Sequence, residues 1–92
     1  MSRFMIEVPH EAEKTACLRA VKVLLETGSH FLTNADFGCL DGEHKAWIVV
    51  DAENKEEACA IVPRAYRADA KVTRLDRFEL KEIEEMMALH ED

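Results

Sequence analysis

The dipeptide Asp41-Gly42 is the feature that most constrains how this chain can fold. It stands between two runs of extended character, residues 30–40 and 43–51. An Asp-Gly pair accepts the positive φ angles that a two-residue hairpin turn requires. We therefore expect an antiparallel hairpin here, and the other elements must be arranged around its two strands.

The elements on either side of the hairpin follow from hydrophobic periodicity. Phe4, Ile6 and Val8 alternate with polar or exposed positions, which indicates a strand that buries one face. Apolar steps of three and four residues indicate amphipathic helices. In chain order we expect a strand at 3–8, a helix at 11–27, hairpin strands at 30–40 and 43–51, a short helix from Asn54 that ends near Pro63, a strand at 70–78 and a terminal helix from Leu80.

This order predicts an α+β fold, a ferredoxin-like βαββαβ sandwich with an antiparallel sheet in the order 4-1-3-2 and an extra C-terminal helix. Within the sheet, we take the rule of right-handed crossovers to make the first and third strands parallel neighbours. The helices should cover one sheet face and leave the other open. For strand 70–78 the facing stays undecided, because Val72 and Leu75 are three residues apart and cannot share a face without a bulge.

Composition sets the class of protein. Apolar residues make up 48% and charged residues 34% of the 92 residues, so we expect one globular domain over 1–92. The formal net charge of −7 would be repelled by phosphate backbones and anionic membranes, so we expect no nucleic-acid and no membrane partner. Cys17, Cys39 and Cys59 lack C-x-x-C spacing, which indicates reduced thiols and a cytoplasmic location.

The open sheet face is the expected functional surface. Trp47 lies there with other apolar side chains, and soluble monomers rarely leave such a patch bare. We therefore expect a homodimer that covers this face, which would also be the binding surface for a small-molecule ligand. The alternative cover is the terminal helix. The candidate ligand-binding residues are Glu7, His30, Asp36, Trp47 and Arg74.

Two alternatives remain open. In the first, the protein is an enzyme without a cofactor, and Glu7 or Asp36 acts as the acid or base in a partly desolvated cavity. In the second, the protein binds nickel or zinc, and His10 and His30 approach each other at one end of the sheet. No tight histidine spacing supports a metal, so we expect no cofactor and assign no metal ligands. Folding about the turn sets Cys39 opposite His44, which we interpret as packing beside the hairpin.

A resemblance supports the fold more than the function. It rests on segments 3–7, 41–42, 51–58 and 74–76, where the chain reads RFMIE, DG, DAENKEEA and RLD. With them the chain resembles, over residues 3–78, small ferredoxin-like proteins of the dimeric α+β barrel group and, more weakly, the nickel-responsive type. That group implies a site between the sheet and a partner, with activities that range from isomerases and monooxygenases to non-catalytic binding. The nickel-responsive type would imply histidine ligands, for which His10, His30 and His44 are available.

Overall fold

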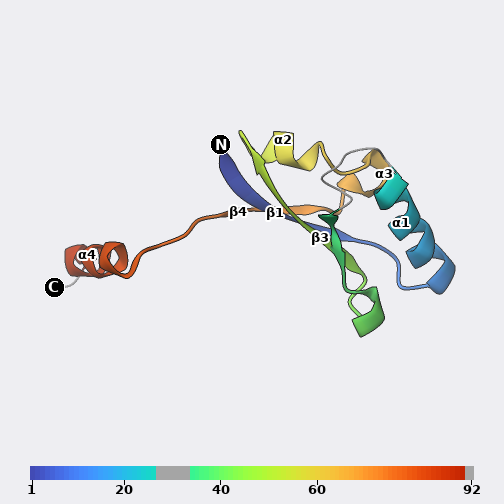
Figure 1. Ribbon diagram of the computed structural model, residues 1–92, viewed down its shortest axis with the longest axis horizontal. Helices are drawn as coiled ribbons and strands as arrows, with labels where there is room; N and C mark the ends of the chain where they lie inside the picture. Colours follow the sequence, from blue (N-terminus) through green and yellow to red (C-terminus); the bar gives the residue numbers. More distant parts are fainter. Residues whose placement is uncertain (27–33, 91–92) are drawn as a thin grey trace.

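The computed structural model describes residues 1–26 and 34–90, and Figure 1 labels most of the elements. The strands and helices follow the expected order, with two short elements added: the 3₁₀ turn η2 inside the hairpin, and the helix α3 after Pro63. They are β1 (Ser2–Pro9), α1 (Lys14–Glu26), β2 (Asp36–Phe37), η2 (Cys39–Asp41), β3 (Lys45–Ala52), α2 (Lys55–Cys59), α3 (Arg64–Arg67), β4 (Lys71–Leu75) and α4 (Leu80–His90).

The strands form one sheet in the order β2-β3-β1-β4, and every neighbouring pair is antiparallel. This confirms the expected βαββαβ connectivity and sheet order, with α4 as the extra helix. The expectation that the first and third strands run parallel is wrong. In this split arrangement the strands joined by the α1 crossover, β1 and β2, run in the same direction, and β3 is inserted between them antiparallel to both.

The hairpin has the expected register but a different turn. Asp36 pairs with Trp47 and Phe37 with Ala46, as the sequence predicts. The pairing ends there, because the chain enters η2 instead of continuing to a two-residue turn. Gly42 closes η2 with φ of 84°, and its amide donates to the carbonyl of Cys39 at 3.1 Å. The positive φ predicted for the Asp-Gly pair thus occurs at the glycine, at the end of a 3₁₀ turn.

The core lies on one face of the sheet. The buried side chains of β1 alternate with partly exposed ones, as the period of two requires. Leu24 from α1, Ala58 from α2 and Val62 beyond it pack against them. The members of this core are Phe4, Ile6, Val8, Leu24, Ala46, Ile48, Val50, Ala52, Ala58 and Val62.

Strand β4 pairs with β1 without a bulge, which decides its facing. Val72 lies opposite Ile6 and Arg74 opposite Phe4, so both belong to the side of the sheet that carries the core. Leu75 lies opposite Arg3 and therefore faces the open side with Lys71 and Thr73. Val72 and Leu75 thus point to opposite faces.

The short helices α2 and α3 follow the sequence signals at their ends. The Asn54 side chain accepts a hydrogen bond from the amide of Glu57 at 2.8 Å, which caps the start of α2. Pro63 separates α2 from α3, since it has no amide to continue the helix. The Arg67 guanidinium then donates to the carbonyl of Val62 at 2.8 Å, which links α3 to the residue before the break.

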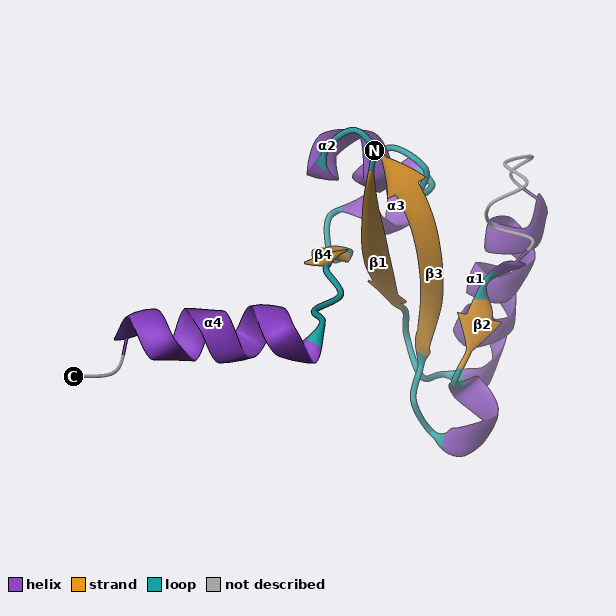
Figure 2. Cartoon of the chain, turned by 60° about the vertical axis from the view of Figure 1, so that its left-hand side comes forward, coloured by secondary structure: helices purple, strands orange, loops and turns teal. Residues whose placement is uncertain are grey.

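Helix α4 projects from the end of β4, away from the sheet and the other helices (Figure 2). The described chain is therefore elongated, with extents of 56 × 28 × 21 Å. The terminal helix does not cover the open sheet face in this chain, contrary to one of the two arrangements expected from the sequence. Over the described residues, no helix has the length and apolar character to cross a membrane.

Gly42 provides a test of the turn. A Cβ added at Gly42 would meet no atom within 4 Å, so substitution there adds only the backbone cost of the left-handed conformation. We expect Gly42→Ala to lower the free energy of unfolding by about 1 kcal/mol, and Gly42→Asn to lower it less, because asparagine tolerates this region better. Urea denaturation of the three chains measures both values. An alanine variant as stable as the unsubstituted chain would contradict the assignment.

Candidate metal centre

Four side chains from separate segments converge at one end of the sheet. They are His10, Cys17, Cys39 and His44. One nitrogen or sulfur from each residue lies within 4.8 Å of those of the other three. Imidazole nitrogens and thiolate sulfurs are both common metal ligands, so the four residues form a candidate metal site.

The two histidines are placed by the central strand pair. Pro9, at the end of β1, pairs with Lys45, at the start of β3, so the next residues outward are His10 and His44. The amide of His10 donates to the carbonyl of His44 at 3.0 Å, which extends the ladder by one step. The two rings meet edge to face with their centroids 5.8 Å apart. The register of β1 and β3 therefore decides that these imidazoles are neighbours.

Cys17 is placed by the first turn of α1. The Glu13 carboxylate accepts hydrogen bonds from the amides of Thr15 at 3.1 Å and Ala16 at 2.8 Å. The carbonyl of Glu13 then accepts from the amide of Cys17 at 2.8 Å. Glu13 thus caps the helix with both its side chain and its backbone. This fixes the start of α1, and with it the buried thiol of Cys17.

Cys39 is placed by the loop around η2. The amides of Asp41 and Glu43 both donate to the carbonyl of Gly38, each at 3.0 Å, which holds the loop closed. A Cβ at Gly38 would lie 2.7 Å from the carbonyl oxygen of Glu43 and 2.7 Å from Cζ3 of Trp47. Only glycine fits between this backbone and the indole. The thiol of Cys39 is thereby presented at a fixed position next to the histidines.

The closest distances within the cluster join sulfur to nitrogen. Nε2 of His10 lies 3.1 Å from Sγ of Cys39 and 3.3 Å from Sγ of Cys17. Nδ1 of His44 lies 3.4 Å from Sγ of Cys17. A tetrahedral zinc ion with bonds of about 2.0–2.3 Å separates its ligand atoms by roughly 3.3–3.8 Å. Three of the six separations among the four atoms therefore lie close to those of a tetrahedral zinc site, and the remaining ones are at most 4.8 Å.

Burial and neighbouring groups favour the neutral forms of His10 and Cys39. Burial lowers the pKa of His10, and the neighbouring His44 lowers it further. Burial also raises the pKa of the Cys39 thiol, and Cys17 adds to that rise. The backbone of Val8 opposes the fall in the pKa of His10 without reversing it. Nδ1 of His10 is buried and has no hydrogen-bond partner among the described residues. The ring is therefore held neutral, with its other nitrogen, Nε2, directed at the two sulfurs.

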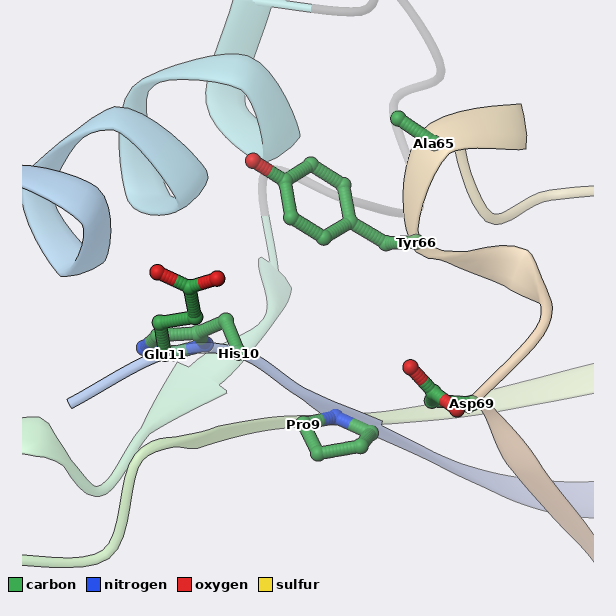
Figure 3. Close-up of a pocket in the computed structure, with 6 residues that line it drawn as sticks. All are labelled: Pro9, His10, Glu11, Ala65, Tyr66 and Asp69. Carbon is green, nitrogen blue, oxygen red and sulfur yellow. The ribbon is translucent and has the colours of Figure 1, made fainter.

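A wide hollow adjoins the cluster on the side of His10 (Figure 3). Its volume is about 610 Å³. Figure 3 shows the Tyr66 ring above the hollow, with the carboxylates of Glu11 and Asp69 on either side of it. The lining residues are Pro9, His10, Glu11, Ala65, Tyr66 and Asp69. His10 thus belongs to both the cluster and the hollow.

The candidate residues expected on the open face are partly brought together. Trp47 donates from its indole nitrogen to Glu7 at 3.3 Å, and Asp36 pairs with Trp47 in the sheet. Arg74 does not join them, since it lies on the opposite side of the sheet and contacts Asp76 at 3.3 Å. His30, the remaining candidate, lies outside the described residues.

The cluster itself was not predicted from the sequence. The cysteines were interpreted as simple thiols, and the contact between Cys39 and His44 as packing beside the hairpin. The metal alternative paired His10 with His30. A usable signal exists: the C-x4-H spacing of Cys39 and His44 spans the turn, and the antiparallel register of the central strands then brings His10 beside His44. Cys17 follows from being on the inner side of the first turn of α1.

No protein-family model, curated protein or solved structure matches this chain. The class of protein therefore rests on its own geometry: a small α+β protein with a four-stranded antiparallel sheet and a cluster of two histidines and two cysteines at one end.

Glu13 tests how the helix start positions the cluster. The amides of Ala16 and Thr15 lower the pKa of this carboxyl from its ordinary value of 4.5. A lowered pKa in the folded state stabilises the protein above the ordinary value and loses this effect as the pH falls through the lowered one. We expect Glu13→Gln to be less stable than the unsubstituted chain near neutral pH, with the difference vanishing in acid.

Thermal unfolding over a series of pH values measures this difference. Glu11→Gln is the matched control, since it removes a neighbouring carboxylate outside the helix start. A Glu13→Gln deficit that persisted unchanged into acid would contradict the capping role.

Proposed function

We propose that this chain is a zinc-binding protein in which His10, Cys17, Cys39 and His44 hold one ion. The observation that carries the proposal is the convergence of four ligand atoms within 4.8 Å of one another. This favours the metal alternative over the small-ligand and enzyme alternatives, because the groups that meet are a set of metal donors. The residues differ from the histidine pair first expected, since both cysteines take part.

The donor set favours zinc over nickel. Two thiolates and two imidazoles in tetrahedral arrangement are typical of zinc sites, whereas Ni²⁺ prefers square-planar or tetragonal nitrogen and oxygen ligands. Zinc has no geometric preference of its own and adopts the tetrahedron that the ligands offer. Three of the sulfur–nitrogen separations, at 3.1–3.4 Å, are already close to those of such a site, and the other ligand atoms lie within 4.8 Å of one another.

The ion would act as a structural link. All four positions of a tetrahedral zinc are filled by protein ligands, which leaves none for a substrate. The ligands come from the end of β1, the first turn of α1 and the loop around η2. One ion therefore joins three segments that lie up to 34 residues apart, from His10 to His44, in the sequence. A domain of this size buries a modest fraction of its surface, so such a link would add substantially to its stability.

The surroundings suit the binding of a cation. The hollow beside His10 has the carboxylates of Glu11 and Asp69 on its wall, and these attract positive charge. Cys17 and Cys39 are free thiols. A reducing compartment such as the cytoplasm, the location proposed from the sequence, would keep them available as ligands.

Calorimetric titration of the metal-free protein with Zn²⁺ tests the proposal. We expect saturation at about one ion per chain, and a loss of affinity of more than about 100-fold in Cys17→Ser or Cys39→Ser, because a missing ligand costs more than a missing supporting contact. Cys59→Ser is the matched control, since Cys59 is the third free cysteine and lies in α2 outside the cluster. It should bind zinc like the unsubstituted chain.

A flat zinc titration of the folded, reduced protein would overturn the proposal. Equal loss of affinity in Cys59→Ser would also do so, since it would place binding outside the cluster. Titration with Ni²⁺ distinguishes the two metals, and tighter binding of nickel than of zinc would contradict the tetrahedral assignment. Substitution with Co²⁺ provides an independent check through the absorption bands of tetrahedral, thiolate-bound cobalt.

Proton release accompanies the binding. Because burial and Cys17 raise the pKa of the Cys39 thiol, this group is protonated at neutral pH and must lose its proton to bind zinc. The apparent affinity should therefore fall as the pH is lowered from about 8 to about 6, and at least about one proton should appear per zinc bound. Calorimetry in buffers of different ionisation enthalpy counts the protons. A proton-independent binding signal would exclude thiolate ligation.

A further inference from the structure

Helix α4 carries an apolar surface that nothing in the described chain covers. Leu80, Met86 and Met87 are 74%, 50% and 57% exposed, and with Ile83 they lie on one side of the helix at steps of three, four and seven. We refer to these four residues as the α4 stripe. Their spacing is that of a helix face that packs against another surface.

The open side of the sheet carries a second apolar surface. Val49 is 54% exposed there, and Met5 lies between Val49 and Thr73 in the register of the three strands. We refer to the apolar side chains and the threonine on this side as the sheet patch: Met5, Trp47, Val49, Thr73 and Leu75. The patch has the width of three adjacent strands, which is enough to seat one helix.

We propose that each of these two surfaces is the partner of the other in a second copy of this chain. In a symmetric dimer, the α4 stripe of each copy packs on the sheet patch of its partner. Closed two-fold pairing makes such a contact twice, because the same two surfaces are present on both copies. The proposal is independent of the zinc site, which lies at a different part of the molecule, beyond the ends of β1 and β3 that meet at Pro9 and Lys45.

The charges that border the two surfaces are complementary. Glu82 and Glu84 flank the α4 stripe on its two sides. On the same face of the sheet, Arg3 precedes Met5 by two residues on β1, and Lys71 precedes Thr73 by two residues on β4. Because these strands are antiparallel, the two cations lie on opposite sides of the row formed by Met5 and Thr73. The acidic Glu7 of this face is already satisfied by Trp47 at 3.3 Å and by Lys45 at 3.9 Å. Asp51 lies opposite Arg3 on this face, so Lys71 on β4 is the cation that the sheet presents to an acidic helix.

The direction of α4 favours another copy over its own sheet. Residues 76–79 join β4 to α4, and they lead the helix away from the sheet (Figures 1 and 2). Four residues span at most about 14 Å, so the connection itself is short. A helix held at a distance from its own domain by a short connection is suited to exchange between two copies.

The area is sufficient for a stable dimer. Three stripe residues and Val49 are at least half exposed, whereas the rest of the two surfaces is partly buried, so the two contacts together would bury on the order of 1,200–1,600 Å². Specific interfaces bury about 1,200–2,000 Å². The exchanged contact thus falls within the range of ordinary stable dimers.

The mass of the full chain in solution, measured by light scattering at several concentrations, tests the proposal. We expect a dimer, and we expect Met87→Glu on the helix and Val49→Glu on the sheet each to yield monomers. Leu89→Glu is the matched control, since Leu89 is 82% exposed on α4 but lies outside the stripe, and this variant should remain a dimer. Far-ultraviolet circular dichroism confirms that each variant is folded.

A mixture of the two monomeric variants distinguishes exchange from other pairings. Val49→Glu keeps an intact helix and Met87→Glu keeps an intact sheet patch, so the mixture should form a heterodimer that retains one of the two contacts. If Met87→Glu alone disrupts the dimer and Val49→Glu does not, the helices pair with each other and the proposal is overturned. A monomeric unsubstituted chain at all concentrations also overturns it, since α4 then covers its own sheet or nothing.

Discussion

The antiparallel pairing of β1 with β3 is the interaction on which the rest of the structure depends. It joins the two longest strands over their whole length, from Ser2 opposite Ala52 to Pro9 opposite Lys45. One face of this pair supplies most of the core, and the other face supplies most of the sheet patch. Beyond its end, the same ladder brings His10 next to His44. Because the side-chain period of a strand is two, a register slip of one residue would move the buried side chains of one strand to the open face. The same slip would separate the two histidines.

The elements with strong local signals were predicted from the sequence. Alternation in β1 and β3, the Asn54 cap and the break at Pro63 each depend on neighbours within a few residues, and all three appear in the structure. Of the described part of the strand expected at 30–40, only Asp36–Phe37 is extended and paired, and the hydrogen bonds around Gly38 turn residues 39–41 into a 3₁₀ turn. The local sequence favours a strand here and does not show that hydrogen bonds to Gly38 stabilise a turn instead.

The cluster of two histidines and two cysteines was not recognised in the same way, because its members are not local in the sequence. Cys17 has the spacing of a core residue in an amphipathic helix, and it is buried like one. Its proximity to Cys39 depends on how α1 packs relative to the hairpin, which hydrophobic periodicity does not determine. Of the residues first considered for metal binding, His10 and His44 do lie in the cluster, since strand register places them. The sequence thus drew attention to two of the four residues of the cluster without assigning either as a ligand, and it singled out neither of the sulfur atoms.

The fit of Gly38 against the indole of Trp47 joins two regions that have different proposed roles. The backbone of Gly38 supports the loop that presents Cys39, whereas the indole belongs to the open side of the sheet. A side chain at position 38 would have to displace either the ring or the loop, so neither region is free to vary alone. Sequence changes that reshape the outer sheet surface would therefore be transmitted to the thiol, and a chain that diverged at Trp47 would be expected to diverge in this loop as well.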